Sequence, residues 1–213
     1  MSSYFHSPTS HSDTDWHSSV IPACQLKVSD PPLMSANSAL NDFFNGGLPW
    51  GYVCEWGSPW GTGGRELILT FLQQIQSGDQ HRSPFWSLWV QGQQSTQFYA
   101  PALHSRSVDL NYLRFAYTKS PLKDLKALFM ESFFKVIVLD SSYLSSEDCA
   151  FLKRQAKQLK QVIILVRPYF LSEKKGNVWA KTRLNCSYDT LHNEYSLSSV
   201  KGLSPRRLVV HSS

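Results

Sequence analysis

The sequence contains no apolar stretch that approaches the roughly 18 residues needed to span a bilayer. Its N-terminal residues, MSSYFHSPTSHSDTDWHSS, are polar and lack the apolar segment of a secretory signal. Cysteine is also scarce: Cys24, Cys54, Cys149 and Cys186 are far apart, and no two of them have CxxC spacing. We therefore expect a cytoplasmic protein with reduced structural thiols, no membrane association and no bound metal.

Lysine is missing from one long segment, since none occurs between Lys27 and Lys119. This segment contains NGGLPWGYVCEWGSPWGTGGRELIL, the stretch around which the chain is organised. Within it, Tyr52–Trp56 predicts a buried strand, Ser58–Gly64 a glycine-rich loop, and Arg65–Ile75 a helix with apolar residues at helical spacing. A strand, a glycine loop and a helix in this order are typical of a phosphate-binding loop.

This loop lacks the side chains that bind phosphate and metal in the pattern G-x-x-x-x-G-K-[ST]. With Gly63 as the second glycine, Ser58 takes the place of the first glycine, Gly64 that of the lysine and Arg65 that of the hydroxyl residue. The backbone amides and Arg65 could still attract an anion, or the glycines could serve only the turn. The candidate anion loop consists of Ser58, Gly61, Thr62, Gly63, Gly64 and Arg65.

Apolar residues make up 42% of the chain and aromatic residues 13%, which is enough for a folded core. Residues 1–30 are interpreted as a disordered Ser/His-rich tail and residues 31–213 as a single domain. Helices are expected near residues 35–44, 65–77, 96–105, 121–134 and 145–159, and further strands at residues 85–90, 112–117, 135–140 and 161–166. Because strands and helices alternate, the predicted fold class is α/β, with a mainly parallel sheet sandwiched between helices. Short strands at residues 177–184, 191–197 and 207–210 are expected to extend the sheet in antiparallel fashion.

Charge is distributed unevenly along the chain. Residues 1–152 hold 9 lysines and arginines against 13 acidic residues, whereas residues 153–213 hold 12 against 3. The basic C-terminal third suggests contact with nucleic acid or with an acidic protein surface, and the alternative is a solvated basic face without a partner.

The order of the motifs resembles the core of RecA-family proteins. Gly46-Gly47-Leu48-Pro49-Trp50-Gly51 precedes the first strand, and Phe98-Tyr99-Ala100-Pro101-Ala102-Leu103 and Val136–Ser141 follow in sequence. Within that family the chain is similar to the ImuA-type damage-inducible mutagenesis accessory proteins, which border on SulA-type cell-division inhibitors. The resemblance extends from about Leu40 to Pro168 and implies a RecA-like P-loop core.

The resemblance also indicates which catalytic groups are absent. The lysine and hydroxyl positions correspond to Gly64 and Arg65, and the water-polarising glutamate corresponds most nearly to Gln93. A neutral amide cannot act as a carboxylate base. Only Asp140, which corresponds to the carboxylate that helps to hold the metal, is retained. We therefore expect no ATPase activity and no cofactor, because phosphoryl transfer depends on positioned cations and a placed water.

Three functions are considered from this resemblance. The first is a non-catalytic adaptor in SOS-induced translesion synthesis, with a Y-family-like ImuB-type protein and an error-prone C-family polymerase as partners, and with RecA, a second copy of the chain and DNA as further candidates. Its contact surface for DNA or an acidic partner is expected to include Tyr169, Phe170, Lys174, Lys175, Arg206 and Arg207. The second is a SulA-like inhibitor of a cytoskeletal GTPase, and the third is an ATP-binding recombinase relative.

Overall fold

The computed structural model describes residues 30–77, 84–95, 99–174, 176–203 and 207–211. The expected N-terminal tail, residues 1–30, lies outside this part of the chain except for Asp30, as do Cys24, Lys175 and Arg206.

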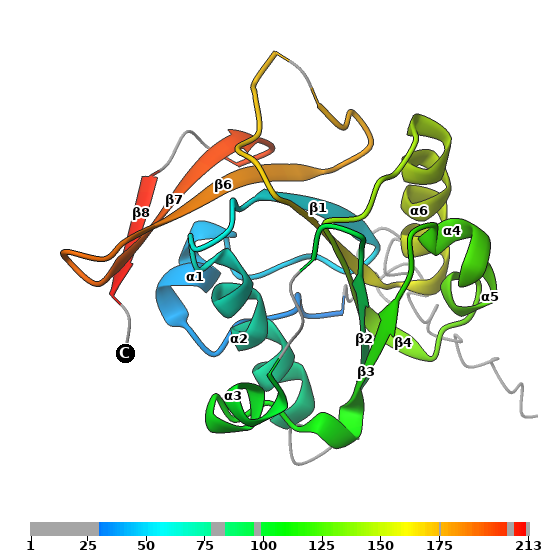
Figure 1. Ribbon diagram of the computed structural model, residues 1–213, viewed down its shortest axis with the longest axis horizontal. Coiled ribbons are helices and arrows are strands. Elements are labelled where there is room, and N and C mark those ends of the chain that lie inside the picture. Colours follow the sequence, from blue (N-terminus) through cyan, green and yellow to red (C-terminus); the bar gives the residue numbers. More distant parts are fainter. Residues whose placement is uncertain (1–29, 78–83, 96–98, 175, 204–206, 212–213) are drawn as a thin grey trace, which may run out of the picture. The chain divides into compact units, whose positions relative to one another are not determined.

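Eight described strands form one sheet in the order β3-β2-β4-β5-β1-β6-β7-β8 (Figure 1). The strands are β1 (Tyr52–Gly57), β2 (Trp86–Gln91), β3 (Leu113–Tyr117), β4 (Phe134–Asp140), β5 (Val162–Arg167), β6 (Thr182–Asp189), β7 (Glu194–Lys201) and β8 (Arg207–His211). Strands β1 to β5 pair in parallel, β6 is parallel to β1, and β7 and β8 are antiparallel additions at the edge. The predicted α/β class with a mainly parallel sheet is confirmed. The predicted antiparallel C-terminal strands are confirmed for β7 and β8, whereas β6 joins the sheet in parallel with β1.

Helices cover both faces of the sheet (Figure 1). The helices are α1 (Ser38–Phe43), α2 (Gly64–Ser77), α3 (Ala100–Ser105), α4 (Pro121–Asp124), α5 (Lys126–Phe129) and α6 (Ser146–Leu159), with a 3-10 turn at Leu110–Tyr112. Apolar residues of α1, α2 and α3 share one buried cluster, and those of α4, α5 and α6 share a second. Along β4, Val136 and Val138 belong to the first cluster and Ile137 and Leu139 to the second. The strand is therefore buried on both faces, as its unbroken apolar run predicts.

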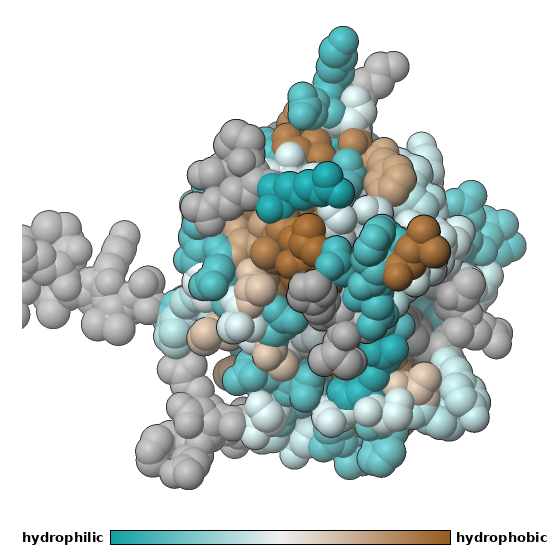
Figure 2. All heavy atoms as spheres, turned by 90° about the vertical axis from the view of Figure 1, so that its left-hand side faces the viewer, coloured by the Kyte–Doolittle hydropathy of each residue, from teal (hydrophilic) through white to brown (hydrophobic). Residues whose placement is uncertain are grey.

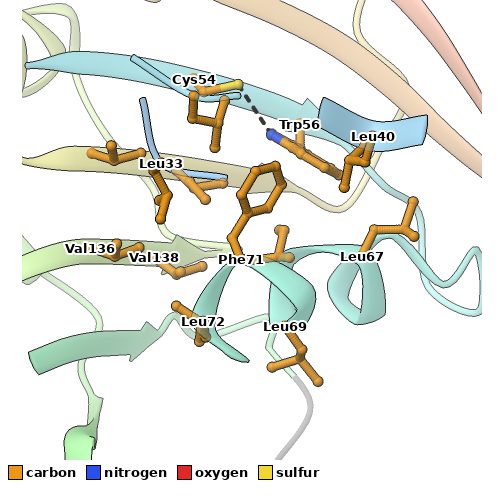
Figure 3. Packing of buried hydrophobic residues seen from close by; sticks show 14 of the residues in the cluster. Leu33, Leu40, Cys54, Trp56, Leu67, Leu69, Phe71, Leu72, Val136 and Val138 are labelled. Carbon is orange, nitrogen blue, oxygen red and sulfur yellow. Dashed lines mark hydrogen bonds between the residues drawn. The ribbon is translucent and has the colours of Figure 1, made fainter. Parts of the chain in front are cut away.

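The larger cluster lies between α2 and the sheet (Figure 3). Phe71 of α2 and Trp56 of β1 are fully buried there. The Trp56 ring stacks on Phe44 at 6.0 Å, and its indole Nε1 donates to Cys54 Sγ at 3.2 Å. This core holds the end of β1 and the start of α2 in a fixed geometry, and it thereby positions the glycine loop between them.

The helix predicted at residues 121–134 was wrong in its extent. Residues 121–134 form two short helices rather than one, because Leu125 leaves the helical conformation at φ −120° and ψ 19° and Phe134 already belongs to β4. The apolar residues Leu122, Leu125 and Leu128 still pack on the second cluster, so their side chains are covered without a continuous helix.

Strands β6 and β7 begin later than expected, at Thr182 and Glu194. Side chains compete for the backbone at both places. The Asn177 side chain accepts a hydrogen bond from the Trp179 amide, and the Asp189 side chain accepts one from the Leu191 amide, so each segment forms a turn.

The predicted start of α6 is confirmed in detail. Ser145 caps the helix by accepting from the Asp148 amide at 3.1 Å, and the Asp148 carboxylate accepts from the Ser145 amide at 2.9 Å. This reciprocal pair is a capping box. Across the described ranges, no helix has the length and apolar character needed to cross a membrane.

Candidate functional site: the glycine loop and the carboxyl edge of the sheet

The glycine loop connects the end of β1 to the first turn of α2. The buried Ser58 extends the pairing of β1 with β5, since its amide donates to the Arg167 carbonyl at 2.9 Å. Thr62 then closes a turn, because both its amide and its hydroxyl donate to the Pro59 carbonyl. Gly61 and Gly63 have φ of +77° and +67°, a region that favours glycine. The turn geometry therefore accounts for these two glycines without any ligand.

Protein atoms also fill the space next to Gly63 and Gly64. A Cβ atom at Gly63 would overlap the ring of Tyr195 on β7, and one at Gly64 would overlap the Ser58 hydroxyl. The Tyr195 hydroxyl donates to Glu66 in the first turn of α2, which holds the ring in place. Gly64 therefore has no room for a side chain as the loop is folded.

Arg65 forms the central interaction of the site. Its Nε donates to Asp140 Oδ2 at 2.9 Å and its Nη2 donates to Asp140 Oδ1 at 2.7 Å, so the pair is bidentate. The side chains are 14% and 1% exposed. The guanidinium also donates to the Ser58 carbonyl at 3.2 Å, and the Trp60 ring covers it at 3.9 Å from Cζ. A planar, delocalised cation fits both the carboxylate and the ring face.

Asp140 is also bound by two hydroxyl groups. Ser141 Oγ donates to Oδ1 at 2.9 Å, and Ser95 Oγ lies 3.4 Å from Oδ2. A carboxylate offers about four acceptor sites, and four donors now point at them. Within the described part of the chain no cluster of three or more histidine, cysteine, aspartate or glutamate residues could hold a metal. A metal ion at Asp140 would have to displace the guanidinium from a buried pair.

Gln93 follows β2 and lines a pocket of about 470 Å³ at the carboxyl ends of β2, β4 and β5. The pocket also contains Lys119, Ser142 and Arg167, and the buried Ser142 hydroxyl has no hydrogen-bond partner among the described residues. The chain leaves β2 toward α3 on one face and β4 toward α6 on the other. Open parallel sheets bind ligands at such switch points. The sequence did not indicate Lys119 or Ser142, because the distance between strand ends depends on strand order.

A second buried ionic group involves Glu55 of β1. Its two carboxylate oxygens accept from Arg167 Nε and Arg183 Nε, each at 2.9 Å, and all three side chains are at most 12% exposed. The sequence alone indicated no role for Glu55. A charged residue within an apolar strand must be paired when it is buried. The position of Glu55 in such a strand could therefore have indicated an ion pair. Its partners are 112 and 128 residues away in the chain, so they could not be identified.

The proposed basic and aromatic surface is divided between two places. Tyr169 and Phe170 are more than half exposed and line one pocket beyond β5, and Lys174 is exposed nearby in sequence. Arg207 lies on β8, and β1, β6 and β7 separate that strand from β5 in the sheet. The face that carries β7 and β8 mixes hydrophilic residues with small apolar areas (Figure 2). Lys175 and Arg206 lie outside the described residues.

No protein-family model matches the chain, and no curated protein is significantly similar to it in sequence.

Proposed function

We propose that the chain is a non-catalytic RecA-like adaptor of the ImuA type that acts in damage-induced translesion synthesis. The observation that carries the proposal is the bidentate pair between Arg65 and Asp140. In a P-loop enzyme the hydroxyl after the lysine and the strand-end aspartate hold a shared magnesium ion. Here a guanidinium from the hydroxyl position binds that aspartate directly, so the charge of the metal is replaced by a fixed side chain.

The remaining catalytic positions support the same conclusion. Gly64 offers no cation, and Ser58 and Cys186 pack where a side chain would begin. Gln93 offers an amide at the position of the water-polarising carboxylate. Transition-state charge in phosphoryl transfer is stabilised by positioned cations, which this loop lacks. We infer that the chain does not hydrolyse ATP and that its fold serves as a docking surface.

The partners of this adaptor are proposed from the same resemblance. They are a Y-family-like ImuB-type protein and an error-prone C-family polymerase. The exposed aromatic residues beyond β5 and the basic C-terminal third give the surface a composition suited to contact with an acidic partner.

The test is a deletion of the gene in the native host, followed by measurement of mutation after ultraviolet damage. We expect the induced mutation frequency to fall to the uninduced level and to be restored by a plasmid copy. Purified protein should show no ATP turnover with or without single-stranded DNA. Unchanged induced mutation together with division arrest on overproduction would indicate a SulA-like inhibitor instead. ATP turnover that Asp140→Ala abolishes would indicate a recombinase relative.

A further inference from the structure

We propose that a partner protein docks through a peptide segment, in which a carboxylate neighbours a large apolar side chain, into the pocket between α6 and the residues that follow β5. This inference rests on the proposed adaptor function and assigns its partner site. The pocket has a volume of about 490 Å³, within the usual range for ligand sites. It lies on the α6 side of the sheet, away from the Arg65–Asp140 pair, and none of the glycine-loop residues lines it.

The charged groups of the pocket favour an anionic partner. Among the described residues, its ionisable lining consists of Arg167, Arg183, Glu55, Cys149 and Tyr169, so two guanidinium groups face a single carboxylate. Burial raises the pKa of Cys149, so the thiol stays uncharged near neutral pH. Ser145 and Ser146 at the start of α6 also line the pocket, and a helix N-terminus carries partial positive charge. Counted over the described residues, the pocket lining therefore carries one positive charge in excess, and its carboxylate is paired.

One further donor in the pocket lacks an acceptor. Asn177 lines the cavity, and its Oδ1 accepts from the Trp179 amide at 2.9 Å. Its Nδ2 is buried and has no hydrogen-bond partner among the described residues. A buried donor that is left unpaired costs free energy, so a ligand acceptor at this position would be favoured.

The rim of the pocket is apolar and exposed. Tyr169, Phe170 and Val178 are 56%, 53% and 71% exposed, and Trp179 completes the wall by donating from its indole Nε1 to Ser146 Oγ at 3.3 Å. Hot spots of protein–protein interfaces are enriched in aromatic residues and arginine, and this pocket contains both. The apolar rim suits a large side chain and the positive floor suits a carboxylate, and a peptide can present both on neighbouring residues.

The pocket is built on anchored backbone. The Leu171 amide and carbonyl are both bound by the Asn185 side chain of β6, at 2.6 and 3.1 Å. Lys201 of β7 donates to the carbonyls of Val178 and Ala180 at 3.1 and 3.0 Å. A preformed site loses less entropy on binding than a flexible one.

A peptide fits these features better than a nucleic acid. Single-stranded nucleic acid is held by a groove of free cations that follows many phosphates. Both arginines of this pocket are already paired with Glu55, and their Nη1 groups donate to the Ser142 and Ser172 carbonyls. The net charge that they leave is a single positive one, which suits one carboxylate better than a run of phosphates.

The experiment selects peptides from a random phage-displayed library on the full chain and measures the selected peptides by fluorescence anisotropy. We expect them to share an Asp or Glu beside an aromatic or large aliphatic residue. The test variant is Val178→Glu, and its matched control is Leu191→Glu at the tip of the β6–β7 turn, where the side chain is 90% exposed. Val178→Glu should weaken binding about tenfold or more, and an acid-to-amide change in the peptide should do the same, whereas Leu191→Glu should have no effect.

Three results would overturn the inference. They are selected peptides without a shared carboxylate, equal effects of the two variants, and an oligothymidylate that binds more tightly than any peptide and is lost only in Val178→Glu. A Val178→Glu gene that restores full damage-induced mutation to the deletion strain would also overturn it, while the adaptor function itself would stand. Loss of both peptide binding and induced mutation in Val178→Glu, with Leu191→Glu unaffected in both, would support the site.

Discussion

Arg65 at the start of α2 and Asp140 at the end of β4 form a buried bidentate ion pair across the carboxyl edge of the sheet. The two residues are 75 positions apart in the chain, and β1, which precedes the loop before Arg65, is separated from β4 by β5 in the sheet. The pair therefore connects the helix that follows the glycine loop to β4 in the parallel part of the sheet. It also places a permanent cation beside the carboxylate at the end of β4.

Removal of both partners of this pair should destabilise the fold by less than the sum of the two single removals. Arg65→Gln or Asp140→Asn alone should each lower the free energy of unfolding by about 3 kcal/mol, because one buried charge is left uncompensated. Arg65→Lys should recover only part of the loss, since an ammonium cannot bind both oxygens in the same geometry. Urea unfolding measures each value. The double variant Arg65→Gln/Asp140→Asn should lose clearly less than the sum of the single losses, and simple additivity would contradict the assigned coupling.

The packing of Gly64 against Ser58 predicts a second non-additive pair. Gly64→Ala should destabilise the protein by about 1–3 kcal/mol, because its Cβ would overlap the Ser58 hydroxyl. Ser58→Gly removes that hydroxyl, so the double variant should regain part of the stability lost in Gly64→Ala. Thermal unfolding followed by circular dichroism compares the variants. If Gly64→Ala is as stable as the wild type, the loop has more space at the lysine position than the structure shows.

Two arginine substitutions compare the contributions of a buried and an exposed ion pair to the free energy of unfolding. Arg183→Gln leaves Glu55 with one cation in a buried site and should cost about 3 kcal/mol of unfolding free energy. Arg106→Gln breaks a pair with Glu66 whose side chains are 48% and 38% exposed, and it should cost less than about 1 kcal/mol. Chemical denaturation of both variants tests the difference. Equal costs would mean that the Glu55 group contributes no more than a surface pair.

The buried thiols predict a loss of stability at alkaline pH. Burial raises the pKa of Cys54 and of Cys186 from 9.0 to about 12. Below pH 9 both states keep the proton, so stability is fully present there. As the pH rises from 9 toward 12, the unfolded thiol ionises and the folded one does not. Each thiol then lowers the free energy of unfolding by about 1.4 kcal/mol per pH unit.

Cys54→Ala and Cys186→Ala test this pH dependence. Each variant should have lower stability at neutral pH because of the lost contacts, but a shallower decline between pH 9 and pH 12 than the wild type. Comparison of slopes cancels the contribution of lysine and tyrosine residues common to all variants. Parallel slopes for wild type and variants would show that these thiols ionise as readily in the folded chain as in the unfolded one.

Local sequence patterns predicted most of the elements but not how residues far apart meet. The apolar run of β4, the spacing of apolar residues in α2 and the start of a helix near Ser145 each depend on neighbours a few positions away, and all three are confirmed. Residues 121–134 show the limit of such patterns. Their apolar residues at helical spacing predict one helix, but two short helices place them on the same cluster. The absence of the phosphate-binding side chains from the loop was predicted from Ser58, Gly64 and Arg65, which occupy the positions of the first glycine, the lysine and the hydroxyl residue.

The sequence by itself determined the alternation of strands and helices, the absence of a lysine from the glycine loop and the excess of positive charge after residue 152. Only the tertiary structure decided that Arg65 binds Asp140, that Tyr195 packs against Gly63, and that Glu55 is held between Arg167 and Arg183. The physical reason is that propensity and periodicity act over a few residues. Ion pairing and packing depend instead on strand order, which brings together residues that the chain separates by up to 132 positions.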